Sequence, residues 1–480
     1  GHVVSDCFAL RDFYQHHMVT KDAVESAALA MNNGCDLNCG HMYLHLSEAV
    51  SRGMVSESRL RAAVTNLYTT RLKLGMEQDK ELPDNPYDKI PYSVVDSVEM
   101  REFNESVSEK TFVLLKNNGI LPLNREKLRT IAVIGPNADS RRALVGNYEG
   151  TASRYITISE GIQDYVGDSV RVLVSEGCDL YKENWKKNRI AEAREMAEMS
   201  DVVILCLGLD AGIEGEQGDA GNDFASGDKP DLKLPGEQNQ ILEAALDSGK
   251  PVVVLLLSGS ALAVNTAQER AAAVMQCWYP GAQGGRAAAR ILFGEVSPQG
   301  HLPVTFYKST EELPEFTDYS MKNRTYRYMK QEALYPFGYG LTYTSFSYDN
   351  MECGAGRQTF QKMKAGEKIQ LPVSVRVCNT GNFDCAETVQ VYVKALCDGS
   401  PNPQLKGFGK VFLKAGEEKQ VTVWLSEEAF ELYDENGQIY FTDEGYTVYI
   451  GGSQPDTRSR TLTGTIPLRQ NLWSEVVNNT

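Results

Sequence analysis

Three carboxylate residues follow apolar, strand-like runs and could carry acid–base or nucleophilic chemistry. Asp6 ends the run GHVVSD, and Glu214 and Glu216 lie in a long Gly- and Asp-rich stretch after VVILCLG. Barrel enzymes and open α/β sheets place catalytic groups and ligands at the carboxyl ends of parallel strands. The competing interpretations are a helix-capping or turn aspartate at Asp6 and a solvated acidic loop around Glu214.

Asp6 and Glu214 are also a chemically complementary pair. Retaining hydrolysis of a glycosidic bond needs one carboxylate as nucleophile and one carboxylic acid as proton donor, about 5–5.5 Å apart. The two residues lie far apart in the sequence. They can form such a pair only if the two domains that carry them meet face to face.

A second cluster has the residue types of a metal site. Its members follow the spacing C-x3-C-x-H-x3-H, and they are Cys35, Cys39, His41 and His45. Zinc fingers place about a dozen residues between their cysteine and histidine pairs, and this cluster does not. We therefore predict a strand–helix junction with surface histidines and no metal. The glycine-rich dinucleotide and P-loop patterns are absent, so no nucleotide is predicted either.

Composition narrows the classes of partner. The chain has 480 residues, of which 42% are hydrophobic and 23% charged, as in a soluble globular protein of about three domains. The net charge is −16, and the basic residues are scattered. This argues against nucleic acid and anionic membrane as partners and is compatible with a neutral substrate. The oligomeric state stays open.

The ten cysteines are sparse for a disulfide scaffold. We therefore favour a reducing, cytoplasmic compartment. If the protein is exported, Cys7 with Cys39, or Cys378 with Cys385, could form a bridge.

The elements that must position the carboxylates follow from periodicity. Residues 1–75 alternate strand, helix, strand and helix, with Thr20 as the cap of the first helix, which is typical of a parallel α/β fold. Residues 76–105 form a linker with three prolines, and a helix is expected over about 101–116.

Two further domains are predicted beyond the linker. Residues 106–305 carry five runs that are apolar on both faces, with helical segments between them, which indicates a mostly parallel sheet in an α/β sandwich. After a connecting segment, 306–345, residues 346–470 read as alternating strands of an antiparallel β-sandwich.

Taken together, the motifs resemble glycoside hydrolase family 3 over nearly the whole chain. They are GHVVSDCFAL, NNGCDLNCG, TFVLLKNNGILPL, IAVIGPNAD, LPGEQ, YPGAQGG, GHLPVTFY and YPFGYGLTYTSF, in this order. The resemblance implies an α/β multidomain protein. Its parts are the last two β/α units of a TIM-type barrel, an α/β sandwich domain and a fibronectin type III-like domain.

The resemblance also implies roles for single residues. Asp6 matches the catalytic nucleophile, and Glu214 matches the acid/base, with Glu216 as the alternative. Cys7 stands where many β-glucosidase-like members have Trp, so it bears on substrate binding and specificity. The implied activity is that of a retaining exo-β-glycosidase on plant-type oligosaccharides, β-xylosidase first and β-glucosidase second, without a cofactor.

Residues 1–75 are short for a (β/α)8 barrel, which needs about 200 residues or more. The sequence also opens without an initiator Met or a signal peptide. We therefore expect that most of the barrel and the native N-terminus are missing, and that this chain alone is inactive. The rival expectation is a non-catalytic carbohydrate-binding or structural remnant.

Overall fold

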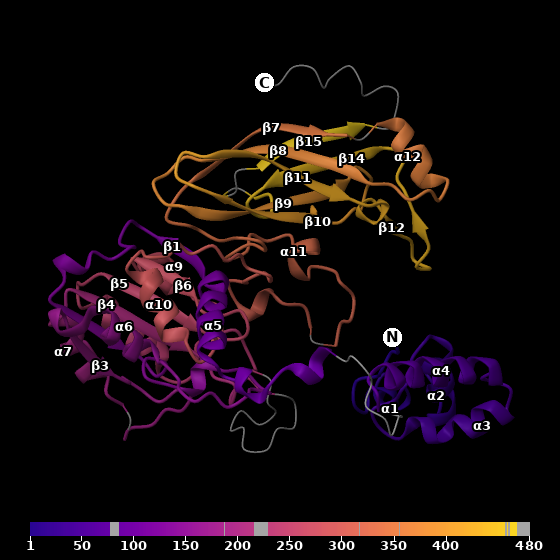
Figure 1. Ribbon diagram of the computed structural model, residues 1–480, viewed down its shortest axis with the longest axis horizontal. Helices are drawn as coiled ribbons and strands as arrows, with labels where there is room; N and C mark the ends of the chain where they lie inside the picture. Colours follow the sequence, from indigo (N-terminus) through magenta and orange to yellow (C-terminus); the bar gives the residue numbers. More distant parts are fainter. Residues whose placement is uncertain are drawn as a thin grey trace. The chain divides into compact units, whose positions relative to one another are not determined.

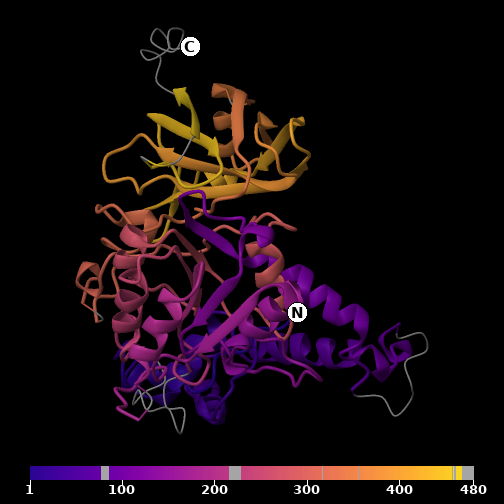
Figure 2. The ribbon, with the colours of Figure 1, turned by 90° about the vertical axis from the view of Figure 1, so that its left-hand side faces the viewer.

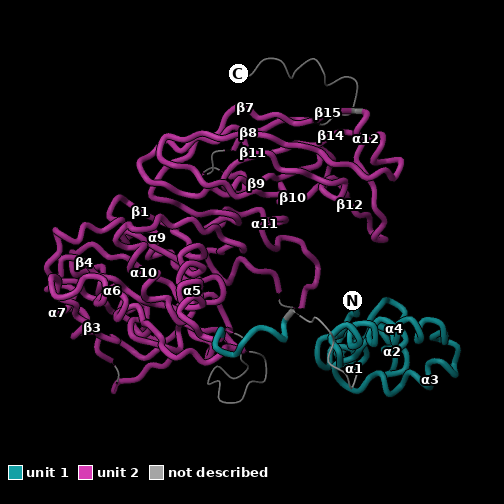
Figure 3. The backbone as a smooth tube through the Cα atoms, viewed as in Figure 1, with its two compact units in different colours: residues 1–94 teal, residues 95–480 magenta. Residues whose placement is uncertain are grey.

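The computed structural model describes residues 1–76, 86–186, 188–215, 229–315, 317–354, 356–456, 458 and 461–467. The chain divides into two compact units, residues 1–94 and residues 95–480, and each is described by itself (Figure 3). Among the helices of the described ranges, none combines the length and the apolar character that crossing a bilayer requires.

The first unit is a small helical body around one parallel pairing. Its helices are α1 (Ala9–Gln15), α2 (Ala23–Asn32), α3 (Leu46–Ser51) and α4 (Glu57–Lys73), and its 3-10 helices are η1 (Met42–His45), η2 (Pro86–Lys89) and η3 (Tyr92–Val94). A parallel bridge joins Val4 to Leu37. The buried faces of α2, α3 and α4 pack together through residues such as Met31, Ala49 and Ala63.

Two local expectations for this unit are corrected. The expected strands at 1–6 and in CDLNCG reduce to the single bridge and its flanking hydrogen bonds, since neither segment has a second strand neighbour among the described residues. The cap of α2 is Asp22 and not Thr20, because the Asp22 carboxylate accepts the Glu25 N–H at 2.8 Å.

The second unit begins with a six-stranded sheet (Figure 1). Its strands are β1 (Val113–Asn117), β2 (Thr130–Ile134), β3 (Arg171–Ser175), β4 (Val202–Gly208), β5 (Val252–Leu257) and β6 (Ala273–Gln276). The spatial order is β1-β6-β5-β4-β2-β3, and all neighbours except β1 and β6 are parallel. The five apolar runs are thereby confirmed as parallel strands.

Helices cover both faces of this sheet. They are α5 (Val98–Thr111), α6 (Ile158–Val166), α7 (Ile190–Glu198), α8 (Gln238–Leu246), α9 (Asn265–Arg270) and α10 (Gly284–Leu292). Alternate strand residues divide between two cores: one contains side chains of α7, α8 and α9, the other side chains of α6 and α10. This period-two division is why the strands read as continuously apolar.

The expected helix over 101–116 is wrong in its second half. Helix α5 ends at Thr111, and Val113–Asn117 form the edge strand β1, antiparallel to β6. Phe112, Leu114 and Leu115 are almost completely buried. A solvent-facing helix turn cannot bury consecutive apolar residues, whereas a strand between two helix layers can.

The rest of the unit is a β-sandwich with its connecting segment. One sheet has the order β10-β9-β14-β15 and the other β11-β8-β7, with the hairpin β12–β13 at the side. The strands are β7 (Phe346–Cys353), β8 (Leu371–Asn379), β9 (Cys385–Ala395), β10 (Gln404–Leu413), β11 (Glu418–Leu425), β12 (Leu432–Tyr433), β13 (Ile439–Tyr440), β14 (Gly445–Gly451) and β15 (Thr461–Pro467). Figure 2 shows the sandwich in a second view. The short helices are α11 (Thr325–Tyr328) and α12 (Arg357–Lys364).

The sandwich core is held by inward-facing residues of both sheets. Val375, Val391 and Val448 are fully buried, and Phe360 of α12 stacks on Tyr446 with ring centroids 5.2 Å apart. The antiparallel sandwich predicted from residues 346–470 is confirmed, whereas α12 was not foreseen. His301 Nε2 lies 3.9 Å from Glu387 Oε1 of β9, where the Glu387 side chain is buried and His301 is largely so.

Candidate active site

Asp6 lies in the turn directly after the parallel bridge of the first unit. Leu37 N donates to Val3 O at 3.0 Å, and Ser5 N donates to Leu37 O at 2.9 Å, so the two segments leave the bridge side by side. The Asp6 carboxylate is exposed and accepts the Cys7 N–H at 2.8 Å. A strand-end carboxylate that is free on its solvent side can reach a ligand.

The turn that carries Asp6 is fixed by a disulfide. Cys7 and Cys39 are bonded, and Phe8 N donates to Cys39 O at 2.8 Å. Of the two bridges named from the sequence, this one forms, while Cys378 and Cys385 carry free thiols. Cys39 of the C-x3-C-x-H-x3-H cluster is the partner of Cys7 in this bond.

Asp36 is a second carboxylate beside this turn, and it is almost completely buried. Its carboxylate accepts from Val3 N (3.2 Å), Arg59 Nη2 (3.1 Å) and Asn66 Nδ2 (3.2 Å). Burial alone would raise the pKa of Asp36, but these donors prevail and hold it below its ordinary value. Asp36 therefore fastens the segment that leads to Asp6 onto helix α4.

Glu214 lies in the second unit, in the turn that follows β4. Its Oε2 accepts Gly259 N at 2.7 Å and the Tyr279 hydroxyl at 2.5 Å, and its Oε1 accepts the Ser260 hydroxyl. Gly259 and Ser260 follow β5, and Tyr279 follows β6. The carboxyl ends of three neighbouring parallel strands thus meet around one carboxylate, the location where open α/β sheets bind ligands.

The pKa values of two neighbours of Glu214 are shifted by burial in this cluster. Burial, reinforced by the Glu214 carboxylate, raises the pKa of Tyr279 well above its ordinary value, so its hydroxyl stays a hydrogen-bond donor. Burial lowers the pKa of Lys229, and Glu214 acts in the opposite direction. The Lys229 ammonium donates to Ala261 O. The cluster is a carboxylate oriented by fixed donors with one cation nearby.

The predicted residues divide between the two units. Asp6 and Cys7 lie together in the first unit, Glu214 lies in the second, and Glu216 lies outside the described residues. Within the described part of the chain, no three His, Cys, Asp or Glu side chains are grouped as metal ligands. Sequence reasoning missed Ser260 and Tyr279, although the strand-end rule that selected Glu214 applies equally to the SGS and YPG turns after the next two strands.

Comparison with known proteins places this arrangement in a family. Residues 112–343 match the glycosyl hydrolase family 3 C-terminal domain, and residues 387–454 match the fibronectin type III-like domain. Residues 112–343 are thus a C-terminal domain of glycoside hydrolase family 3.

Several known proteins resemble the chain over nearly its whole length. A "Xylan 1,4-beta-xylosidase" of Xylanibacter ruminicola is 29% identical, covering 97% of this chain and 69% of that protein. The solved structure of a family 3 exo-β-xylosidase in complex with a xylobiose aziridine probe has a TM-score of 0.79 and 26% identity, covering 97% of this chain and 61% of that one. A β-glucosidase of Erythrobacter marinus has a TM-score of 0.77 and 30% identity, with 97% and 63% covered. The chain therefore spans about two thirds of the length of these proteins.

Proposed function

We propose that this protein is a retaining exo-acting β-glycosidase that releases non-reducing terminal sugars from plant-type oligosaccharides, and that it acts as a β-xylosidase. The observation that carries the proposal is the likeness over 97% of the chain to a protein named xylan 1,4-β-xylosidase. The exposed carboxylate of Asp6 in a disulfide-fixed turn and the oriented carboxylate of Glu214 support it.

In the proposed reaction Asp6 attacks the anomeric carbon and forms a glycosyl-enzyme ester, while the glycosidic C–O bond breaks. Glu214 gives its proton to the leaving oxygen. It then takes a proton from a water molecule, whose oxygen displaces Asp6 from the sugar. The donors Gly259 N, Ser260 and Tyr279 would set the direction of the Glu214 carboxylate, and no metal or organic cofactor takes part.

A β-glucosidase is the second candidate, because the Erythrobacter marinus β-glucosidase is about as similar as the xylosidases. The proposal favours xylose because Cys7, and not Trp, follows Asp6. Initial rates on nitrophenyl β-xyloside and β-glucoside, measured on the protein expressed from its complete reading frame, decide between them. A glucoside preferred in kcat/KM would replace xylosidase by glucosidase.

The role of Asp6 is tested by Asp6→Asn in the same full-length protein. The amide preserves shape but cannot form the ester, so turnover falls by several orders of magnitude. Asp12→Asn, a carboxylate six residues further along on helix α1, is the matched control and keeps wild-type activity. More than about a tenth of activity remaining in Asp6→Asn would exclude Asp6 as the nucleophile.

The role of Glu214 is tested against Glu216. Glu214→Gln is expected to slow substrates with poor leaving groups far more than activated aryl xylosides, which need little protonation. Added azide is expected to restore turnover and to give a xylosyl azide. If Glu216→Gln has this signature and Glu214→Gln does not, the proton donor is Glu216.

A further inference from the structure

The β-sandwich contains a cleft that the proposed reaction does not use. Its volume is about 410 Å³, within the range of small-molecule sites. Its walls come from helix α11, from the loop between β9 and β10, and from the β12–β13 hairpin. None of its lining residues belongs to the cluster around Glu214.

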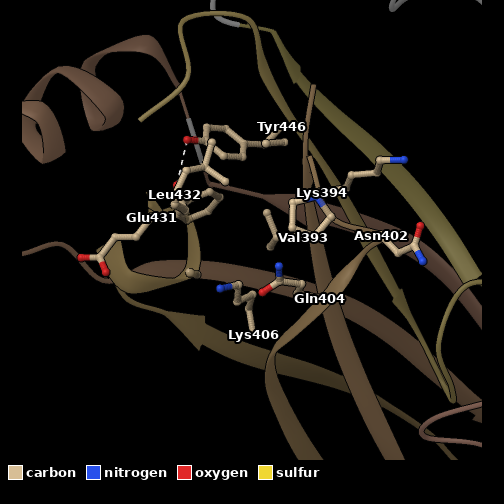
Figure 4. Close-up of a pocket in the computed structure, with 12 residues that line it drawn as sticks. Val393, Lys394, Asn402, Gln404, Lys406, Glu431, Leu432 and Tyr446 are labelled. Atoms are coloured by element: carbon tan, nitrogen blue, oxygen red, sulfur yellow. Dashed lines mark hydrogen bonds between the residues drawn. The ribbon is translucent and has the colours of Figure 1, made fainter. Parts of the chain in front are cut away.

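Polar residues of β10 line the cleft. Gln404 and Lys406 of this strand, and Glu431 of the segment before β12, line both the cleft and the smaller pocket drawn in Figure 4. The pairing of β10 with β9 is irregular between Leu405 and Gly407, so that Lys406 has no partner residue in the register. Bulges of this kind redirect side chains and are enriched next to binding sites. No hydrogen bond within the described chain occupies the carboxamide of Gln404.

Tyrosine residues of α11 and of the β12–β13 hairpin also line the cleft. Tyr433 is 62% exposed and Tyr440 44% exposed, and Tyr328 of α11 is half-buried. An exposed tyrosine offers an apolar face and a hydroxyl at its edge. A pyranose ring matches this combination, because its faces carry C–H groups and its rim carries hydroxyls.

The two sides of the cleft are tied together. Asn402 of the loop donates from Nδ2 to Tyr326 O (3.0 Å) and Met329 O (2.8 Å), and its N–H donates to Arg327 O at 2.8 Å. Tyr326 in turn stacks on Phe337, with centroids 4.2 Å apart. The cleft is therefore largely formed before a ligand arrives, which lowers the entropic cost of binding.

The charges around the cleft select the class of ligand. Arg327 and Lys406 carry two positive charges, and Asp398 and Glu431 carry two negative ones. A phosphorylated or acidic ligand would meet two carboxylates, and a cationic ligand would meet Arg327 and Lys406. A neutral ligand rich in hydroxyls can use donors and acceptors of both kinds.

We propose that this cleft is a second carbohydrate site, which binds a neutral β-linked oligosaccharide of the kind cleaved at the active site. The choice of xylo-oligosaccharides as its ligand rests on the proposed function; the site itself rests on the cleft. A site that holds the polymer on the same chain raises the effective concentration of sugar ends for hydrolysis.

The test measures binding of xylohexaose and cellohexaose to the 480-residue chain by titration calorimetry, with excess xylose present to occupy a monosaccharide site. Replacing both Tyr433 and Tyr440 by Ala is expected to weaken xylohexaose binding by about tenfold or more. Gln404→Ala is expected to weaken it about fivefold. Trp424→Ala is the matched control: this ring is 59% exposed on β11, outside the cleft, and its removal leaves binding unchanged.

Three outcomes are decisive. Loss of binding in the cleft variants, with the control unaffected, supports the proposal. Equal binding by all variants, or no binding by the wild-type chain, overturns the second site and leaves the proposed hydrolysis, which is measured separately on nitrophenyl xyloside, untouched. Cellohexaose bound in the cleft in place of xylohexaose supports the site and overturns xylo-oligosaccharides as its ligand.

Discussion

The buried carboxyl group of Glu387 makes the stability of the β-sandwich depend on pH. Burial raises the pKa of Glu387 from 4.5 to about 7. The Tyr348 hydroxyl, the Thr388 N–H and the Lys410 ammonium act in the opposite direction but do not prevail. His301, 3.9 Å away, adds no positive charge at neutral pH, because burial lowers its pKa to about 4.

The sign and size of the effect follow from the raised pKa. Between pH 4.5 and 7 the folded state holds a proton on Glu387 that the unfolded state has released. The stabilising contribution is therefore complete below pH 4.5 and is lost as the pH rises through 7. Between pH 5 and pH 8 the loss amounts to about 2.5 kcal/mol.

Glu387→Gln removes this proton and keeps the shape of the side chain. The free energy of unfolding of the wild type, minus that of the variant, is expected to fall by about 2.5 kcal/mol from pH 5 to pH 8. His301→Gln is expected to show the opposite pH dependence, so that the same difference rises from pH 5 to pH 8. Because its folded pKa is depressed, the contribution of His301 is present above pH 6.5 and is lost as the pH falls toward 4.

The assay is urea unfolding followed by circular dichroism at pH 5, 6, 7 and 8. At each pH, the free energy of unfolding of the variant is subtracted from that of the wild type, and only these differences are compared. Other titrating groups cancel in these differences. A Glu387→Gln difference that stays constant within about 0.5 kcal/mol across this range would refute the assignment of a raised pKa. A change of the same sign for both variants would show that the two groups titrate as an ion pair and not as separately buried groups.

Three further predictions concern the scaffold and the carboxylate cluster. Asp36→Ala leaves Arg59 without its buried partner and is expected to lower the free energy of unfolding of the first unit by about 3 kcal/mol or more in a urea titration. Glu57→Ala, which removes an exposed ion pair, is the control and is expected to cost almost nothing. Equal effects of the two substitutions would contradict a clamping role for Asp36. Gly161→Ala places a methyl group 2.1 Å from the backbone of α10 and is expected to lower the melting temperature. Gly150→Ala is the control, because a methyl group at this position faces open space. Equal melting temperatures of the two variants would contradict the close approach of α6 to α10. Tyr279→Phe removes one hydrogen-bond donor from Glu214. It is expected to lower kcat on unactivated xylosides about tenfold, with the fold and KM unchanged. An unchanged kcat would show that the Tyr279 hydroxyl does not orient the proton donor.

Sequence periodicity predicted the parallel strands well, because a strand that is buried on both sheet faces is a continuous run of apolar residues. Runs such as PVVVLLL admit few other structures. The edge strand β1 was not predicted, because TFVLLK continues the apolar spacing of α5. A short apolar run fits a helix and a strand equally well. Only the pairing with β6, distant in sequence, decides between them.

The candidate site was predictable in its carboxylates but not in their surroundings. Strand ends pointed to Asp6 and Glu214, whereas the donors Ser260 and Tyr279 belong to turns that become neighbours only through the order of the sheet. Spacing alone also could not choose between the two cysteine bridges. Pairing of residue 7 with residue 39 depends on the parallel bridge between Val4 and Leu37.

The position of β1 at the far edge of the sheet has a consequence for synthesis of the protein on the ribosome. Val113–Asn117 leave the ribosome before every other strand of the sheet, yet their partner, β6, begins only at Ala273. At about 5–20 residues per second, β1 waits roughly 8 to 30 s for its partner. During this time an apolar segment is exposed next to a growing, open-edged sheet. Nascent chains halted before residue 273 should therefore recruit chaperones, and chains released after residue 276 should not.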